Sequence, residues 1–260
     1  MRGRTIFSDR VGARLILPQR ERATVTSRSV LITGGNRGIG YALAEHFISL
    51  GDKVAVTSRS GEGGPEGALT VKADVTDPAS LDEAFAEVEK EQGSVEVLIA
   101  NAGITDDQLM LRMSDDSFES VVNTNLNGTF RTVKRAIKGM MRKKQGRIIL
   151  LSSVVSLLGS PGQVNYASSK AGLIGMARSL TRELGSRGIT TNVIAPGYIE
   201  TEMTSQLDDA RKKQYLSQIP AGRFAAPAEV AKVAAFLASD DASYISGAVI
   251  PVDGGLGMGH

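Results

Sequence analysis

The chain has no cysteine and no tryptophan, and only two of its 260 residues are histidine. Without cysteine there is no disulfide, no thiolate nucleophile and no sulfur-ligated metal site. Two histidines leave little from which to build a zinc site, so we expect no bound metal. The longest apolar stretches, such as RIILLSSVV, are far shorter than the ~20 residues that a transmembrane helix needs. These absences predict a soluble, cytoplasmic protein that neither spans a membrane nor uses metal chemistry.

Acidic residues are scarce at the start of the chain. Residues 1–28 hold seven arginines against two acidic residues, a net charge of +5, which leaves −3 for residues 29–260 of a chain whose total is +2. No convincing helical or strand period precedes Ser29. We therefore interpret 1–28 as a basic extension, a flexible or loosely docked tail. Nucleic-acid binding by this extension has no further support along the chain, so we expect no such partner.

Residues 29–260 alternate short apolar runs with helical patterns, which suits one large domain. The predicted strands are 29–34, 53–59, 68–75, 95–103, 147–153, 189–197 and 247–255. The predicted helices are 37–51, 77–93, a long one from near Ser114 into the basic cluster 142–146, then 165–188 and 227–240. Near-continuous Val/Ile/Leu strands separated by helices indicate an α/β fold, a Rossmann-type doubly wound parallel sheet of about seven strands. Ligands of such sheets bind at the carboxyl ends of the strands.

The first strand runs directly into the glycine-rich stretch TGGNRGIG, residues 33–40. Its glycines at 34, 38 and 40 let the backbone approach a pyrophosphate at the start of the following helix. The spacing is G-x-x-x-G-x-G and not the general G-x-G-x-x-G pattern, and alone it also fits a tight structural turn. We predict a dinucleotide site here.

The end of the second strand indicates which dinucleotide. An acidic residue at that point holds the ribose 2′-hydroxyl of NAD, whereas arginine accommodates a 2′-phosphate. Here Ser58 and Arg59 come first, no acid appears until Glu62, and Arg37 lies in the glycine loop. The sequence therefore predicts NADPH, because a solvated surface position is a reasonable interpretation for either arginine alone but less so for both together.

Three polar groups stand between apolar runs in SSVVSLLGSPGQVNYASSKAGLIG, residues 152–175. Tyr166 and Lys170 are four apart and share one helix face, whereas Ser153 ends a predicted strand. We expect the ammonium to lower the tyrosine pKa from its usual value near 10, and a decrease of ~2 to 3 requires ~3 to 4 kcal/mol. Tyr166 would then donate a proton near neutral pH, and Ser153 would hold a carbonyl oxygen. A tyrosine and a lysine four apart are otherwise most often a surface pair.

These motifs resemble the classical short-chain dehydrogenases/reductases, over about residues 29–260. TGGNRGIG looks like the glycine loop of that family, NAG at 101–103 like its fourth-strand motif, and YASSK like its Y-x-x-x-K. The resemblance implies the catalytic set Asn125, Ser153, Tyr166 and Lys170. It implies cofactor contacts at Gly34, Asn36, Arg37, Gly38, Ile39, Gly40, Ser58, Arg59, Asp74, Val75, Asn101, Ala102, Gly103, Tyr166, Lys170, Pro196, Gly197, Ile199 and Thr201.

Within the family the sequence is most similar to bacterial, particularly actinobacterial, 3-oxoacyl-[acyl-carrier-protein] reductases. The resemblance implies NADPH-dependent reduction of the 3-keto group in type II fatty-acid synthesis, with Ser153 and Tyr166 holding the carbonyl oxygen. It implies that Tyr166 supplies the proton, that Lys170 binds the nicotinamide ribose, and that Asn125 kinks its helix and holds a water for proton relay. It further implies an acyl carrier protein as partner and a homotetramer built through helix 165–188, its neighbour and the last strand, with Met258 and His260 at a subunit boundary.

Two regions bear on the substrate. Residues 197–220, with Ile199, Met203 and Leu207 able to face inward, fit either a lid over cofactor and acyl chain or an ordinary surface helix. A set of basic side chains fits either an acidic carrier protein or solvated helix ends. Its members are Arg142, Lys143, Lys144, Arg147, Arg178, Arg182 and Arg187.

Two other functions stay open. A related reductase acting on acetoacetyl-CoA, a steroid, a sugar or a xenobiotic carbonyl fits the same motifs. A catalytically silent NADPH sensor or scaffold is disfavoured by the complete catalytic set. We assign no catalytic role to His46 or His260.

Overall fold

The computed structural model describes residues 27–205 and 208–258, so nearly all of the predicted extension lies outside the described residues. Seven parallel strands in that part of the chain form one sheet in the order β3-β2-β1-β4-β5-β6-β7. They are β1 (Ser29–Thr33), β2 (Lys53–Ser58), β3 (Leu69–Lys72), β4 (Val97–Ala100), β5 (Gly146–Leu151), β6 (Ile189–Pro196) and β7 (Val249–Val252). The order reverses between β1 and β4, which places the ligand crevice of a doubly wound sheet there. The predicted fold class is confirmed.

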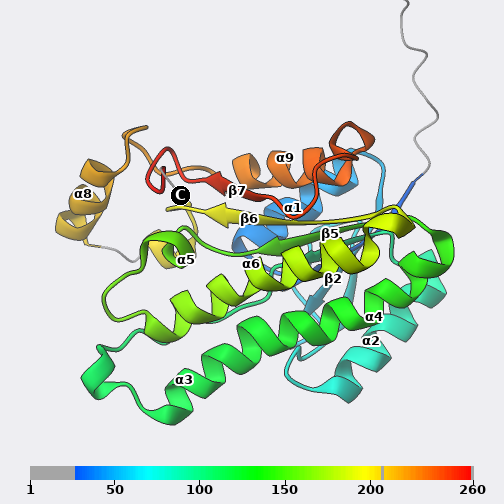
Figure 1. Cartoon of the computed structure of the whole chain (residues 1–260), viewed down its shortest axis with the longest axis horizontal. Helices are drawn as coiled ribbons and strands as arrows, with labels where there is room; N and C mark the ends of the chain where they lie inside the picture. The colour runs from blue at the N-terminus through cyan, green and yellow to red at the C-terminus, as the bar shows by residue number, and fades with distance from the viewer. Residues whose placement is uncertain (1–26, 206–207, 259–260) are drawn as a thin grey trace, which may run out of the picture.

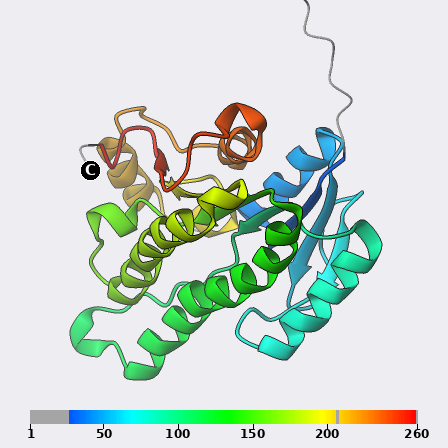
Figure 2. The same cartoon turned by 45° about the vertical axis from the view of Figure 1, so that its right-hand side comes forward.

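Helices cover both faces of the sheet (Figures 1 and 2). α1 (Gly38–Ser49) and α9 (Pro227–Ala238) lie on one face, and α2 (Pro78–Gln92), α4 (Gly128–Lys143) and α6 (Val164–Leu184) on the other. Side chains alternate along β1, because Leu31 joins the core under α2, α4 and α6 while Val30 and Ile32 join the core under α1 and α9. Burying such a side chain stabilises the fold by ~1.5–3 kcal/mol.

Local signals set several helix ends. Asp77 accepts a hydrogen bond from the Ala79 N–H (2.9 Å), and Pro78 opens α2, within the predicted helix 77–93. Lys144 ends α4 in the left-handed region, with φ of 53°. At the amino end of the sheet Arg28 pairs with Asp52 (2.7 Å) and donates to the Ala238 carbonyl (2.6 Å), so it is joined to the folded domain.

The predicted long helix from Ser114 is divided. It consists of α3 (Asp115–Val122), a π-helical segment η2 (Asn123–Asn127) and α4, because the Asn125 side chain is bonded to a neighbouring loop. Two short helices, η1 (Met110–Arg112) and α5 (Val155–Leu158), were not predicted from the sequence. The lid candidate, residues 197–220, contains α7 (Glu202–Ser205) and α8 (Asp209–Gln218). The remaining described elements are the 3-10 helices η3 (Gly185–Arg187) and η4 (Asp240–Ala242).

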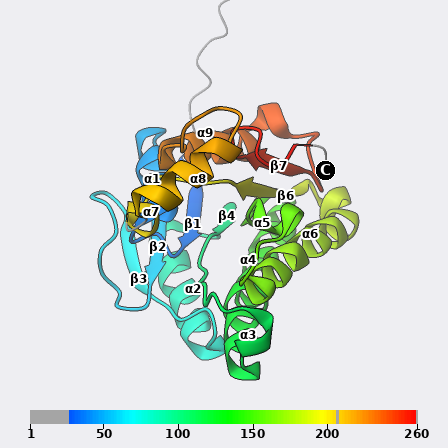
Figure 3. The same ribbon diagram turned by 90° about the vertical axis from the view of Figure 1, so that its left-hand side faces the viewer.

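Within the described ranges, no helix is both long and apolar enough to cross a membrane. The carboxyl ends of the strands face the viewer in Figure 3, together with α5, α7 and α8. The start of α6 lies at the same edge (Figure 1).

Candidate active site

The glycine loop between β1 and α1 is packed against the end of β4. Gly34 has φ of +67°, and a Cβ there would lie 3.0 Å from the Ala102 Cα. A Cβ on Gly40 would collide with the Gly34 carbonyl. The Asn101 amide fastens this contact, since its Nδ2 donates to the carbonyls of Gly34 (2.9 Å) and Thr33 (3.0 Å). These positions therefore need glycine, and the loop keeps a bare backbone next to the helix N-terminus.

The loop after β2 carries the groups predicted to select NADPH. Arg59 is exposed there, and Arg37 is exposed in the glycine loop. The Arg59 charge helps to lower the pKa of Asp74, after the larger effect of hydrogen bonds from Thr76. The Ser58 hydroxyl is buried and already bonded, because it accepts from the Glu62 N–H (3.0 Å) and donates to the Glu62 carbonyl (2.9 Å). Ser58 therefore shapes the loop, and the arginines are the exposed groups that can meet a phosphate.

A cavity of about 150 Å³ lies at the carboxyl ends of β4 and β5. Its walls are Ile39, Asn101, Gly103, Ile104, Thr105, Leu151, Ser152, Tyr166 and Lys170. The structure thus brings the predicted tyrosine and lysine beside the glycine loop. A larger cavity of about 250 Å³, lined by Tyr198, Arg223 and Asp253 among others, contains none of the predicted catalytic side chains.

Lys170 is 4% exposed, and its Nζ donates to the Leu151 carbonyl (2.7 Å). The Nζ lies 5.8 Å from the centre of the Tyr166 ring. Burial lowers the pKa of Lys170 to about 8. The ammonium is therefore close to the phenol, but it is bonded to the backbone of β5.

The pKa of Tyr166 is raised, which contradicts the prediction that Lys170 lowers it. Burial, which penalises the phenolate, is the largest cause, a hydrogen bond with Ser153 acts in the opposite direction, and the charge of Asp107 raises the pKa further. In the protein alone the phenol is therefore held in its protonated form. Ser153 lies two residues after the end of β5 and accepts a hydrogen bond from the Val155 N–H (3.2 Å) at the start of α5.

Asn125 is fully buried in the π-helical segment. Its Oδ1 accepts from the Ile104 N–H (2.8 Å), and its Nδ2 donates to the Ile104 carbonyl (3.0 Å) and the Ser169 hydroxyl (3.0 Å). A Cβ on Gly103 would lie 3.0 Å from the Asn125 Oδ1 and 3.3 Å from the Lys170 Nζ. Asn125 thus anchors the loop beside the lysine, and its part in a water relay stays a prediction.

The other predicted contacts are spread around the cleft. Thr201 faces the glycine loop, because a Cβ on Gly38 would lie 3.5 Å from its Cγ2. Val75 and Ile199 are buried in the two cores, so Ile199 does face inward, and Gly197 passes close to the Asp253 backbone. Asn36 packs beside Gly63. Pro196 ends β6, and Ala102 lies against Gly34.

Sequence reasoning missed several residues of the cleft. Ile104, Thr105, Leu151 and Ser152 line the cavity. Ser152 had a usable signal as the polar neighbour of Ser153 at a strand end. Leu151 accepts the hydrogen bond of Lys170 with its backbone carbonyl. Every residue type has this group, so the residue type at position 151 does not predict the contact.

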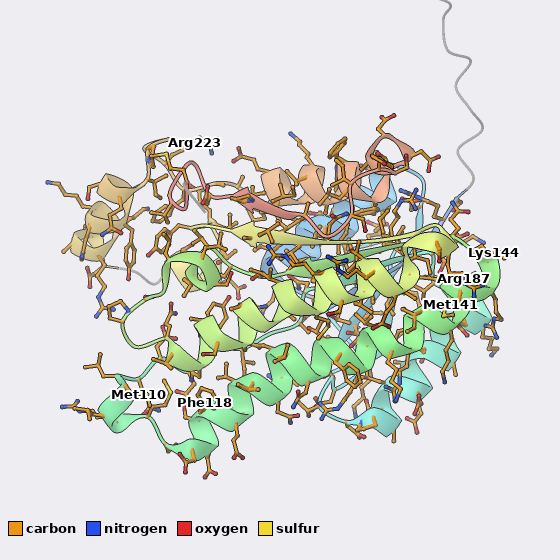
Figure 4. The ribbon with its side chains drawn as sticks, viewed as in Figure 1. Met110, Phe118, Met141, Lys144, Arg187 and Arg223 are labelled. Atoms are coloured by element: carbon orange, nitrogen blue, oxygen red, sulfur yellow. The ribbon has the colours of Figure 1, made fainter. Side chains whose placement is uncertain are left out.

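The substrate regions differ from their predictions in two respects. Arg147 is buried and pairs with Asp240 (3.1 Å), which removes it from the exposed basic set. Lys144 and Arg187 lie at the far ends of α4 and α6, opposite the edge where α6 begins (Figure 4). In the lid candidate, Tyr198 stacks on Tyr215 of α8 (ring centres 4.4 Å apart). The Met203 side chain and Leu207 lie outside the described residues.

A doubly wound sheet with a bare glycine loop, a serine just beyond the end of β5 and a tyrosine–lysine pair on α6 defines a nicotinamide-dependent oxidoreductase. The family model described as enoyl-(acyl carrier protein) reductase matches residues 34–257. The chain belongs to the short-chain dehydrogenase/reductase family.

Curated relatives of the chain carry more specific names. It is 56% identical over 234 residues to the 3-oxoacyl-[acyl-carrier-protein] reductase MabA of Mycobacterium tuberculosis (strain ATCC 25618 / H37Rv), covering 90% of this chain and 94% of the relative. It is 55% identical over 239 residues to MabA of Mycobacterium avium, with 92% and 93% covered. It is 46% identical over 236 residues to the 3-oxoacyl-[acyl-carrier-protein] reductase FabG of Escherichia coli (strain K12), with 88% and 96% covered.

Proposed function

We propose that this chain reduces 3-oxoacyl-[acyl-carrier-protein] to the 3-hydroxyacyl form with NADPH. The observation that carries the proposal is the meeting of Tyr166, Lys170 and the glycine loop around one cavity, with Ser153 just beyond the end of β5. The names of the mycobacterial and enterobacterial relatives supply the substrate class.

The residues of the crevice fit a dinucleotide. Side chains at Gly34 and Gly40 would strike the neighbouring backbone, so the loop is open where a pyrophosphate would meet the N-terminus of α1. Arg37 and Arg59 would hold the 2′-phosphate by charge-assisted hydrogen bonds. When bound, NADPH supplies a hydride for the 3-keto carbon.

Side chains of this protein bind the keto oxygen of the substrate and supply the proton that it receives. The hydroxyls of Ser153 and Tyr166 hold the keto oxygen as negative charge develops on it, and Tyr166 gives its proton to that oxygen. Burial keeps the phenol protonated until that moment, because it raises the pKa of Tyr166. Lys170 holds the nicotinamide ribose with its ammonium and returns a proton toward Tyr166, through water near Asn125 in our proposal.

The acyl carrier protein is proposed to dock on the basic ends of α4 and α6. α6 is 21 residues long, so this end lies ~30 Å from its start at the rise of an α-helix. Within one copy that is far from the cavity. In a homotetramer with antiparallel pairing of these helices, Lys144 and Arg187 of one copy would lie beside the cavity of another. The exposed Phe130 (52%) and Met141 (40%) on α4 favour a covered face there.

The test compares initial rates of NADPH oxidation with acetoacetyl-[acyl-carrier-protein] and with acetoacetyl-CoA, and repeats both with NADH. We expect the carrier-bound substrate with NADPH to give the highest kcat/KM. Equal rates on both thioesters would favour a CoA reductase. Tight NADPH binding without turnover of either thioester would contradict the proposal and favour another carbonyl substrate or a silent sensor.

A further inference from the structure

The first turn of α6, which carries Tyr166, is hydrogen-bonded to the loop after β4. Among the described contacts Gln163, the residue before α6, makes no side-chain cap, although a helix start leaves backbone N–H groups in need of acceptors. Asn165 fills part of this need, because its Oδ1 accepts from the Tyr166 N–H (2.7 Å). Its Nδ2 donates to the Asp106 carbonyl (2.8 Å) in the loop after β4. This fully buried amide therefore links the loop directly to the backbone of Tyr166.

Two further bonds join the same pair of segments. The Gln163 Nε2 donates to the Asp107 Oδ2 (2.8 Å), and the Gln108 N–H donates to the Gly162 carbonyl (2.8 Å). A hydrogen bond to a carboxylate is stronger than one between neutral groups. The Asp107–Gln163 bond therefore adds a charge-assisted hydrogen bond to the backbone contacts between the two segments.

The loop is also fixed at its other end. Asn125 bonds both backbone groups of Ile104, which lines the cavity. Residues 104–108 are thus held between the π-helical segment and the start of α6. Neither Asp107 nor Gln163 lines the cavity. A change at either residue reaches Tyr166 through the start of α6, and the charge of Asp107 also acts on the pKa of Tyr166.

We propose that Asp107, Gln163 and Asn165 form a clasp that positions the Tyr166 hydroxyl for proton transfer to the substrate. The inference rests on the proposed function. A proton donor must lie within ~2.6–3.2 Å of its acceptor, and a misplacement of ~1 Å is able to cost ~100-fold in rate. Asp107, Gln163 and Asn165 are positioning residues in this scheme, because they act through Tyr166.

Exchange of the two partners of the side-chain bond tests the clasp. Gln163→Glu sets two carboxylates against each other, and we expect kcat for acetoacetyl-CoA to fall at least ~10-fold while KM for NADPH changes little. Adding Asp107→Asn restores a donor and an acceptor with their places exchanged, and we expect it to recover most of the lost kcat. Gln145→Glu makes the same charge change on an exposed residue at the opposite sheet edge and should leave kcat unchanged. A double variant as slow as Gln163→Glu, or a Gln163→Glu enzyme with full kcat, would overturn the clasp.

Amide hydrogen exchange gives a readout that does not depend on turnover. The Tyr166 N–H should exchange faster in Gln163→Glu than in wild type and be protected again in the double variant. Equal protection in the three proteins would refute the clasp. If the wild type reduces no thioester but this exchange pattern is seen, the proposed function fails while the clasp stands.

Discussion

Replacing Lys170 by methionine should stabilise the protein at neutral pH while removing its activity. Burial lowers the pKa of Lys170 from 10.5 to about 8, so holding the charged form costs the fold ~3 kcal/mol at 1.36 kcal/mol per pKa unit. Methionine has a similar shape and no charge. It also loses the bond to the Leu151 carbonyl, a loss of ~1.5–3 kcal/mol because the donor is charged. We therefore expect Lys170→Met to raise the free energy of unfolding at pH 7 by up to ~2 kcal/mol, or Tm by up to ~8 °C in a domain of this size.

The pH dependence distinguishes this cause from general repacking. Between pH 8 and 10.5 the unfolded chain binds the lysine proton more than the folded chain does, so the stability of the wild type rises with pH. The penalty is present in full below about pH 8 and is lost above the unfolded pKa of 10.5. Thermal unfolding of both proteins at pH 7 and pH 10 measures it. A variant less stable than wild type at pH 7, or a difference that does not shrink toward pH 10, would refute the reasoning.

Four further outcomes test the site. Tyr166→Phe should abolish turnover and keep NADPH affinity, measured by fluorescence titration, and a variant that retains its rate would exclude the tyrosine as proton donor. Arg59→Ala should raise KM for NADPH ~10-fold or more with little effect on NADH, since charge-assisted bonds to phosphate contribute ~1.5–3 kcal/mol; equal effects on both cofactors would contradict the 2′-phosphate role. Gly103→Ala should lower kcat by displacing the Lys170 Nζ, which the new Cβ would meet at 3.3 Å, and a full rate would show that the lysine has room to move. Charge reversal at Lys144 and Arg187 should raise KM for the carrier-bound substrate and spare acetoacetyl-CoA, whereas equal losses on both would make the basic ends structural.

The fold could be predicted because its signals are local. Apolar strands, helical spacing and a proline after Asp77 each specify an element without knowledge of its neighbours. The π-helical segment depends instead on the bonds of Asn125 to Ile104, which lies 21 residues away. Arg147 was predicted to be an exposed basic residue because the elements that pack against β5 and pair with Arg147, α9 and η4, lie near the other end of the chain.

The candidate site shows the same limit in its electrostatics. Spacing predicts correctly that Tyr166 and Lys170 share a helix face. It gives the wrong sign for the tyrosine pKa, because the lysine ammonium is bonded to the Leu151 carbonyl and the phenol of Tyr166 is buried. The Gln163–Asp107 bond was missed for a related reason, since its partners are 56 residues apart.

Opposite pKa shifts on the two groups define when the site is ready for reduction. Burial disfavours the charged form of each, so it raises the pKa of Tyr166 and lowers that of Lys170 to about 8. As pH rises, the lysine therefore loses its proton before the tyrosine does. Below about pH 8 the site holds a neutral phenol and an ammonium, the pair that our proposed mechanism requires as proton donor and ribose anchor. Above it, the first group lost is the cation and not the proton donor. A fall in reductase rate through pH 8 should accordingly appear as weaker cofactor binding, in KM for NADPH, before kcat declines.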